Sequence, residues 1–195
     1  MQHNKKFTIV GYSFGTLVAI EIVRRLEKKG CNGKLILLDG SPQYIQGFMQ
    51  YFFGHKLDNV SLLDDYFTIV TIPFQDTLSY DTIKASYSEL LSYTGKMEKL
   101  SDYTNHQTKY SLKYLEENIH GLVNRIHMVY QYTTTETIAT PITLIRPKEA
   151  GMANFAHDYN LNGITSGKVD VQFINGNHTT MLSDNNLSTL LNELI

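Results

Sequence analysis

The 195-residue chain is predicted to be an α/β protein built on a partial parallel sheet. Two apolar runs, 7–10 and 35–38, read as strands, and they flank a helix-like segment within about thirty residues. That spacing is typical of a strand–helix–strand unit. Each run is mainly apolar and is followed by glycine or aspartate, as expected for strands that are buried on both faces of a sheet.

The helix between these strands is predicted over 16–29. Leucine, valine and isoleucine recur often enough along it for a largely buried helix. Lys28 and Lys29 fall in its last turn, where positive charge is favourable, and Gly30 is placed to cap its end.

The rest of the chain divides by pattern. A third strand is predicted at 142–145 and a closing helix over 184–195. The alternation of Val169, Val171 and Phe173 with polar residues predicts a fourth strand with one wet face. Residues 43–132 have helical periodicity. We therefore expect one domain, with a core formed by 1–42 and 133–195 and a helical cap inserted over 43–132.

A short motif joins the first strand to the helix. It reads Gly11-Tyr12-Ser13-Phe14-Gly15, which is G-x-S-x-G between a strand and a helix. This is the context of a nucleophile elbow, the sharp turn that exposes a serine hydroxyl in the α/β-hydrolase fold. The turn leaves little room for side chains, so both flanking positions are expected to require glycine.

A serine nucleophile needs a base, usually histidine, and an acid that orients the base. In α/β hydrolases the order along the chain is serine, acid, histidine, each after a strand. Ser13, Asp39 and His178 follow the first, second and last predicted strands in this order. Glu149, after the third strand, is the alternative acid, and six other histidines are present: His3, His55, His106, His120, His127 and His157.

Each of these residues also has an ordinary structural interpretation. Asp39 precedes glycine, a pair that favours turns, and His178 lies in a turn where it could bond to backbone. The oxyanion of an acyl-transfer reaction needs two donors. The backbone N–H of Phe14, at the amino end of the helix, is the first. The second normally comes from an earlier strand, which this chain lacks.

Composition narrows the function classes. The net charge of −2 and the pI near 6.4 do not indicate a nucleic-acid partner. The single cysteine, Cys31, excludes an intrachain disulfide and favours a cytoplasmic setting. The N-terminal apolar run is too short for a signal peptide or a membrane span. No metal-ligand spacing, P-loop or dinucleotide fingerprint is present.

Several motifs together resemble the thioesterase domain that ends animal (type I) fatty acid synthases. They are Gly11-Tyr12-Ser13-Phe14-Gly15, Leu38-Asp39-Gly40-Ser41-Pro42, Asp158-Tyr159-Asn160-Leu161, Gly167-Lys168-Val169 and Gly176-Asn177-His178. The resemblance covers nearly the whole chain and implies release of a long-chain fatty acid, typically palmitate, from an acyl carrier domain. The acyl group would be carried on phosphopantetheine, with no cofactor bound to this chain.

The resemblance also implies residue roles. Ser13, Asp39 and His178 match the family's triad, and it places the acid at Asp39 rather than at Glu149. Tyr44 and Phe48 fall where that family lines an acyl groove. The partners it implies are the acyl carrier domain and the rest of a fatty acid synthase.

The chain departs from that family in two respects. The family usually has Asp-His-Arg at the histidine, where this chain has Asn177-His178-Thr179. The family's first strands are also absent, so the chain reads as truncated on its N-terminal side and the strand at 7–10 is expected to have an unpaired edge. Two alternatives therefore stay open: a fragment that binds acyl chains or a partner without turnover, and a carboxylester hydrolase.

Overall fold

A computed structural model of the chain describes residues 5–53, 95, 98, 112–134, 136–152 and 154–195. The chain forms two compact units, one of Met1–Phe48 with Gln131–Ile195 and the other of Met49–Tyr130. All the candidate site residues proposed above belong to the first unit.

The elements of the first unit agree with the predicted ones to within about three residues, the usual uncertainty of helix and strand ends. Its larger elements, in chain order, are β1 (Lys6–Tyr12), α1 (Gly15–Lys28), β2 (Asn32–Leu38), α2 (Pro42–Phe53, which continues into the second unit), β3 (Ile142–Pro147), β4 (Val169–Ile174) and α7 (Asn185–Leu194). Two short 3₁₀ helices, η2 (Leu161–Gly163) and η3 (Thr180–Ser183), precede and follow β4. Helix α6 (Leu112–Gln131) lies within 43–132, the range that has helical periodicity in the sequence.

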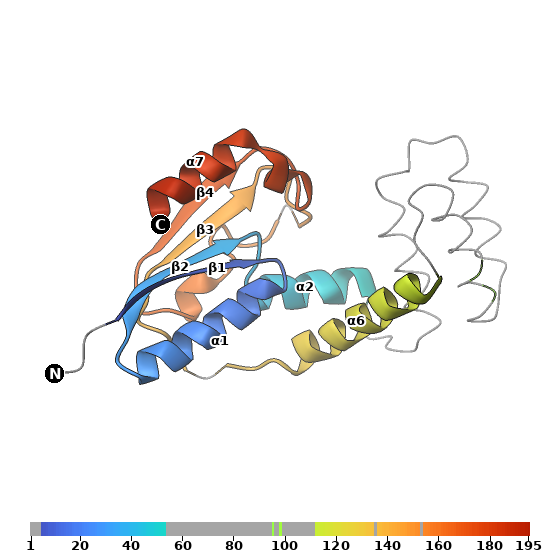
Figure 1. The fold of residues 1–195 in the computed structure, drawn as a ribbon, viewed down its shortest axis with the longest axis horizontal. Helices are drawn as coiled ribbons and strands as arrows, with labels where there is room; N and C mark the ends of the chain where they lie inside the picture. The colour runs from blue at the N-terminus through green and yellow to red at the C-terminus, as the bar shows by residue number, and fades with distance from the viewer. Residues whose placement is uncertain (1–4, 54–94, 96–97, 99–111, 135, 153) are drawn as a thin grey trace. The chain divides into compact units, whose positions relative to one another are not determined.

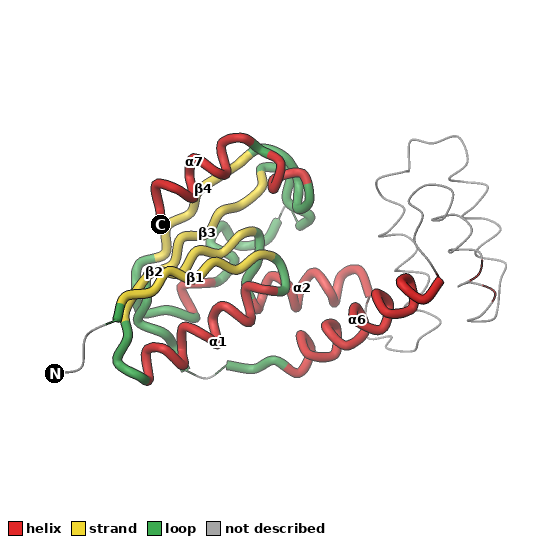
Figure 2. The backbone as a smooth tube through the Cα atoms, in the orientation of Figure 1, coloured by secondary structure: helices red, strands yellow, loops and turns green. Residues whose placement is uncertain are grey.

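The described strands form a parallel sheet of four strands in the order β1-β2-β3-β4. In the register, Val10 lies beside Ile36, Leu38 beside Ile145, and Pro147 beside Ile174. Because all four strands run the same way, their carboxyl ends lie at one edge of the sheet (Figures 1 and 2). The sheet confirms the predicted fold class, a partial α/β-hydrolase core.

Both faces of the sheet are covered, which explains the continuous apolar runs in its strands. Leu35 and Leu37 pack with α1 in one cluster, and Ile36 and Leu38 pack with Leu187 of α7 in another. Figure 1 shows α1 and α7 on opposite sides of the sheet. Successive residues of a strand point to opposite faces, so β2 contributes to both clusters.

The prediction of one buried face for β4 is only partly right. Val169 and Val171 pack against the α1-side cluster, but Phe173 is 48% exposed. Among the described strands β4 is last in the sheet order, so one of its sides has no strand beside it. The alternation of residue types shows which side chains share a face, but not how completely that face is covered.

The end of α1 confirms the predicted glycine cap. Gly30 has φ +75°, its N–H donates to Glu27 O at 2.8 Å, and the N–H of Cys31 donates to Leu26 O at 3.0 Å. This pair of bonds is the Schellman arrangement, in which a left-handed residue turns the chain away from the helix. The turn leads the chain directly into β2. No helix of the described residues is long and apolar enough to cross a membrane.

Candidate active site

Ser13 occupies a strained turn between β1 and α1. Its φ is +54°, a left-handed conformation that is uncommon for a residue with a side chain. The Ser13 N–H donates to Leu38 O at 3.0 Å, and its carbonyl accepts from the N–H of Thr16 at 3.0 Å and from Thr16 Oγ1 at 2.7 Å. Such strain costs about 1–3 kcal/mol and persists only where surrounding contacts hold it. These bonds tie Ser13 to β2 and to the first turn of α1.

The two glycines of the motif are not equivalent. A Cβ atom on Gly11 would lie 2.7 Å from Ala19 Cβ and 2.8 Å from Gly15 O, so β1 and α1 can approach this closely only with glycine there. A Cβ on Gly15 would meet nothing within 4 Å. The prediction that both positions need glycine is therefore right for Gly11 and wrong for Gly15, because α1 carries the second position away from the strand.

Asp39 lies at the end of β2, beside the serine turn. Its side chain is buried, its φ is +45°, and its N–H donates to Ile145 O at 2.9 Å. The next residue, Gly40, packs so closely that an added Cβ would lie 2.9 Å from the carbonyl oxygen of Ser13. Gly40 thus allows the loop after β2 to reach the serine turn. The preference of the Asp39-Gly40 pair for turns does not by itself indicate this close packing.

His178 follows β4 and completes a line of three side chains. Its Nε2 lies 2.9 Å from Ser13 Oγ, and its Nδ1 lies 2.7 Å from Asp39 Oδ2. An ionised carboxylate only accepts hydrogen bonds, so Nδ1 carries the proton in the neutral ring and Nε2 is free to accept from the serine hydroxyl. This arrangement can deprotonate Ser13 and stabilise the imidazolium that forms.

Asn177 shapes the turn that presents His178. Its Oδ1 accepts hydrogen bonds from the N–H groups of Thr179 and Thr180, both at 3.0 Å, at the start of η3. The preceding residue, Gly176, has φ +92°, and a Cβ there would lie 2.5 Å from Thr180 Oγ1. Asn177 therefore caps this turn as a neutral acceptor.

Tyr12 also contacts His178, and the sequence analysis missed it. Its hydroxyl donates to the carbonyl oxygen of His178 at 2.7 Å, and its ring stacks on the imidazole with 4.9 Å between centroids. Burial, and next the charge of Asp39, raise the pKa of Tyr12, so it stays a donor at neutral pH. The position of Tyr12 next to Ser13 in the sequence was the one hint of its role. Its contact with His178 could not be inferred, because the two residues are 166 positions apart.

The alternative acid and base lie elsewhere. Glu149 is exposed, and its N–H donates to Gly176 O at 3.1 Å. His157 is exposed and its ring lies against Phe173, and His127 lies on α6 in the second unit. His3, His55 and His106 lie outside the described residues, as does the side chain of His120. Across the described part of the chain, no cluster of three or more histidine, cysteine or acidic side chains could hold a metal ion.

Phe14, the predicted oxyanion donor, immediately precedes α1 with φ −53° and ψ −31°. The first N–H groups of a helix have no partner within it, and the helix dipole favours negative charge at that end. The structure thus places this N–H next to Ser13, and its role stays a prediction.

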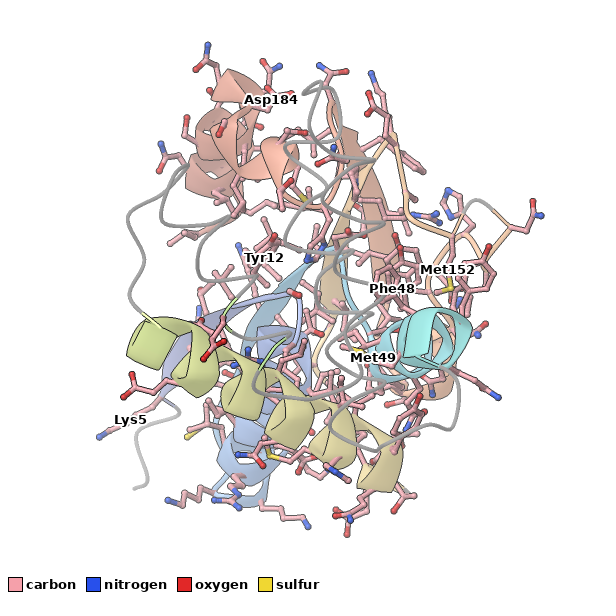
Figure 3. All side chains as sticks on the ribbon, turned by 90° about the vertical axis from the view of Figure 1, so that its right-hand side faces the viewer. Lys5, Tyr12, Phe48, Met49, Met152 and Asp184 are labelled. Atoms are coloured by element: carbon pink, nitrogen blue, oxygen red, sulfur yellow. The ribbon has the colours of Figure 1, made fainter. Side chains whose placement is uncertain are left out.

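The two predicted acyl-groove residues lie on α2 but differ in exposure. Tyr44 is 4% exposed and stacks on Tyr159 with 3.8 Å between ring centroids. Phe48 is half-buried, and Gly151 leaves space for its ring: an added Cβ there would lie 3.1 Å from it. Figure 3 labels Phe48 and Met152, and a Cβ added to the neighbouring Gly47 would lie 3.6 Å from Met152 Cε. Of the predicted pair, Phe48 has the larger surface to offer to a ligand.

Comparisons with known proteins identify the family of this chain. The model of the thioesterase domain family matches residues 1–195. One similar solved structure is a four-domain nonribosomal peptide synthetase, holo-AB3403, bound to AMP and glycine, with a TM-score of 0.73 and 17% identity over 99% of this chain and 14% of that one. The Vlm2 thioesterase domain has a TM-score of 0.61 and 18% identity over 95% of this chain and 65% of that one. Human thioesterase 2 has a TM-score of 0.51 and 15% identity over 98% of this chain and 72% of that one. The chain spans 65% of the Vlm2 domain structure. The family match over the entire length shows that this chain belongs to the thioesterase domain family.

Proposed function

We propose that the chain hydrolyses acyl thioesters through an acyl-enzyme formed on Ser13. One observation carries the proposal: Ser13 Oγ, His178 and Asp39 form a continuous line of contacts at 2.9 and 2.7 Å. A serine hydroxyl is a weak nucleophile until an adjacent base accepts its proton. The contact at Nε2 supplies that base.

The reaction would proceed in two transfers. Ser13 Oγ attacks the thioester carbonyl while His178 Nε2 takes its proton, and the N–H of Phe14 donates to the oxyanion. The C–S bond then breaks, and the leaving thiolate receives the proton from His178. Water attacks the acyl-enzyme with His178 again as base, releasing the carboxylic acid and regenerating Ser13. Asp39 holds the ring tautomer and stabilises the imidazolium at both stages.

For the substrate we propose a long-chain acyl group, palmitate-like, on the phosphopantetheine arm of an acyl carrier domain, within fatty acid biosynthesis in the cytoplasm. The motif resemblance to animal fatty acid synthase thioesterases supports this choice, as does the half-buried aromatic ring of Phe48 on α2. Each buried CH₂ of an acyl chain contributes about 0.8 kcal/mol, so an apolar wall of this kind favours long chains.

The test is hydrolysis of palmitoyl-CoA by the purified chain, with Ser13→Ala and the exposed Ser188→Ala as matched serine variants. We expect Ser188→Ala to match the wild type and Ser13→Ala to lose activity by on the order of 10⁶-fold. A folded wild type without turnover would overturn the proposal and favour a protein that binds acyl chains or a partner non-catalytically. Faster turnover of p-nitrophenyl palmitate than of palmitoyl-CoA would favour an ester hydrolase.

A further inference from the structure

Tyr159 contacts the oxygen of Asp39 that faces away from His178. The Tyr159 hydroxyl donates to Asp39 Oδ1 at 2.6 Å, while Asp39 Oδ2 meets His178 Nδ1 at 2.7 Å. The two residues are 120 positions apart in sequence, and Tyr159 is fully buried. The phenol and the imidazole therefore bind opposite oxygens of one buried carboxylate.

The backbone around Tyr159 is built to hold this position. Tyr159 has φ +53°, a conformation that is costly for a bulky residue. Ser41 Oγ donates to its carbonyl oxygen at 2.7 Å, and its own N–H donates to Ala156 O at 3.0 Å. Ser41 is two residues after Asp39, so the loop that carries the acid also anchors the tyrosine.

The ring of Tyr159 is held on both sides. Tyr44 stacks on it at an interplanar angle of 6°, and the Arg146 guanidinium lies 4.2 Å from its centroid. Arg146 is itself 6% exposed, and its Nη1 donates to Ala156 O at 3.2 Å, on the same loop. A ring packed in this way has little freedom to turn its hydroxyl away from Asp39.

We propose that Tyr159 is a positioning residue for the triad: its hydroxyl fixes the plane of the Asp39 carboxylate and turns Oδ2 toward His178. A buried carboxylate oxygen without a donor is strongly disfavoured, and the Tyr159 hydroxyl supplies a donor to Oδ1. Burial, and next the charge of Asp39, raise the pKa of Tyr159, so its hydroxyl stays protonated at neutral pH and can donate to Asp39.

Removal of the Tyr159 hydroxyl should change the pH at which the Asp39–His178 pair takes up a proton. A donor to the carboxylate stabilises the deprotonated pair, so its removal raises the apparent pKa at which the pair takes up a proton. Among the described residues, other titratable or charged groups in contact with His178 or Tyr159 include Tyr12, which stacks on His178, and Tyr44 and Arg146, which lie against the Tyr159 ring. All of them are retained when only the Tyr159 hydroxyl is changed.

The test replaces that hydroxyl and follows the His178 ring by NMR as pH varies. Tyr159→Phe keeps the stacked ring and should raise the apparent pKa of the pair by about one unit. Tyr132→Phe is the matched control, because Tyr132 also donates to a carboxylate, Glu21, at 2.7 Å but does not contact the triad. The control should leave the His178 titration unchanged. An unchanged titration in Tyr159→Phe would overturn the proposal.

A second variant covers the case in which Tyr159→Phe does not fold. Incorporation of 3-fluorotyrosine at position 159 keeps the hydroxyl and makes it a stronger donor, so the apparent pKa of the pair should fall instead of rise. A titration that stays in place, or that moves upward, would contradict the proposed role.

The kinetic part of the test rests on the proposed thioesterase activity. In palmitoyl-CoA hydrolysis, the acid limb of kcat/KM should move to higher pH in Tyr159→Phe, with kcat reduced more than KM is changed. The NMR arm separates the two hypotheses. A shift of the His178 titration in a protein without turnover would refute the thioesterase activity and support the positioning role of Tyr159. Turnover without a shift would support the thioesterase activity and refute the positioning role.

Discussion

Replacement of the two motif glycines by alanine should have opposite effects on stability. In Gly11→Ala the new Cβ would lie 2.7 Å from Ala19 Cβ, and ordinary contact begins near 3.4 Å, so β1 and α1 must separate by 3.4 − 2.7 = 0.7 Å. Two of the three close atoms, Gly15 O and Thr16 Cα, belong to the backbone and cannot rotate away. Overpacking of this kind costs about 1–3 kcal/mol.

In Gly15→Ala the added methyl meets nothing within 4 Å, and position 15 is the first residue of α1. Alanine is favoured over glycine in helices by up to about 1 kcal/mol, so this variant should be as stable as the wild type or more so. Urea unfolding of the three proteins measures the difference. A wild-type midpoint for Gly11→Ala, or a loss of stability in Gly15→Ala as large as in Gly11→Ala, would refute this difference between the two glycines.

Three further predictions follow from the site and its surroundings. Asp39→Asn should lower kcat for palmitoyl-CoA by on the order of 10⁴-fold with little change in fold by circular dichroism, because the amide no longer holds the productive His178 tautomer; wild-type kcat would contradict this. Tyr12→Phe keeps the stacked ring but removes the bond to the His178 carbonyl, and should cost about 1 kcal/mol in urea unfolding; an unchanged midpoint would count against that bond. Asp184 caps α7 through the N–H of Asn186 at 2.8 Å, and this bond lowers the pKa of Asp184 below the ordinary 3.8. The stabilising effect of the cap is therefore complete above pH 3.8 and is lost as pH falls through the lowered pKa. Thermal unfolding of Asp184→Ala should differ from wild type at pH 6 and converge with it in strong acid, whereas Asp184→Asn, which retains an acceptor, should stay close to wild type.

The part of the site that depends on strand positions and on parallel topology could be predicted from the sequence. Ser13, Asp39 and His178 each follow a strand, and parallel strands bring their carboxyl ends to one edge. Topology alone therefore predicted that the three would lie together, and the distances between their side chains agree. The catalytic roles of the three remain a proposal.

The supporting contacts could not be predicted in this way. Tyr159 reaches Asp39 across 120 residues, and Tyr12 reaches the His178 carbonyl across 166. Neither partner is indicated by periodicity, capping or turn chemistry, which are local signals. The space beside Gly15 and the exposure of Phe173 likewise depend on which elements pack nearby, and residue type alone does not specify that.

Covalent labelling would show whether Ser13 is an activated nucleophile. The wild-type chain would be treated with a fluorophosphonate, which reacts with serines activated by a neighbouring base, and analysed by intact mass and peptide mapping. We expect one adduct per chain, on Ser13, absent from Ser13→Ala and greatly slowed in His178→Ala. A folded wild-type protein that gains no adduct, or gains it on another residue, would show that Ser13 is not activated by His178.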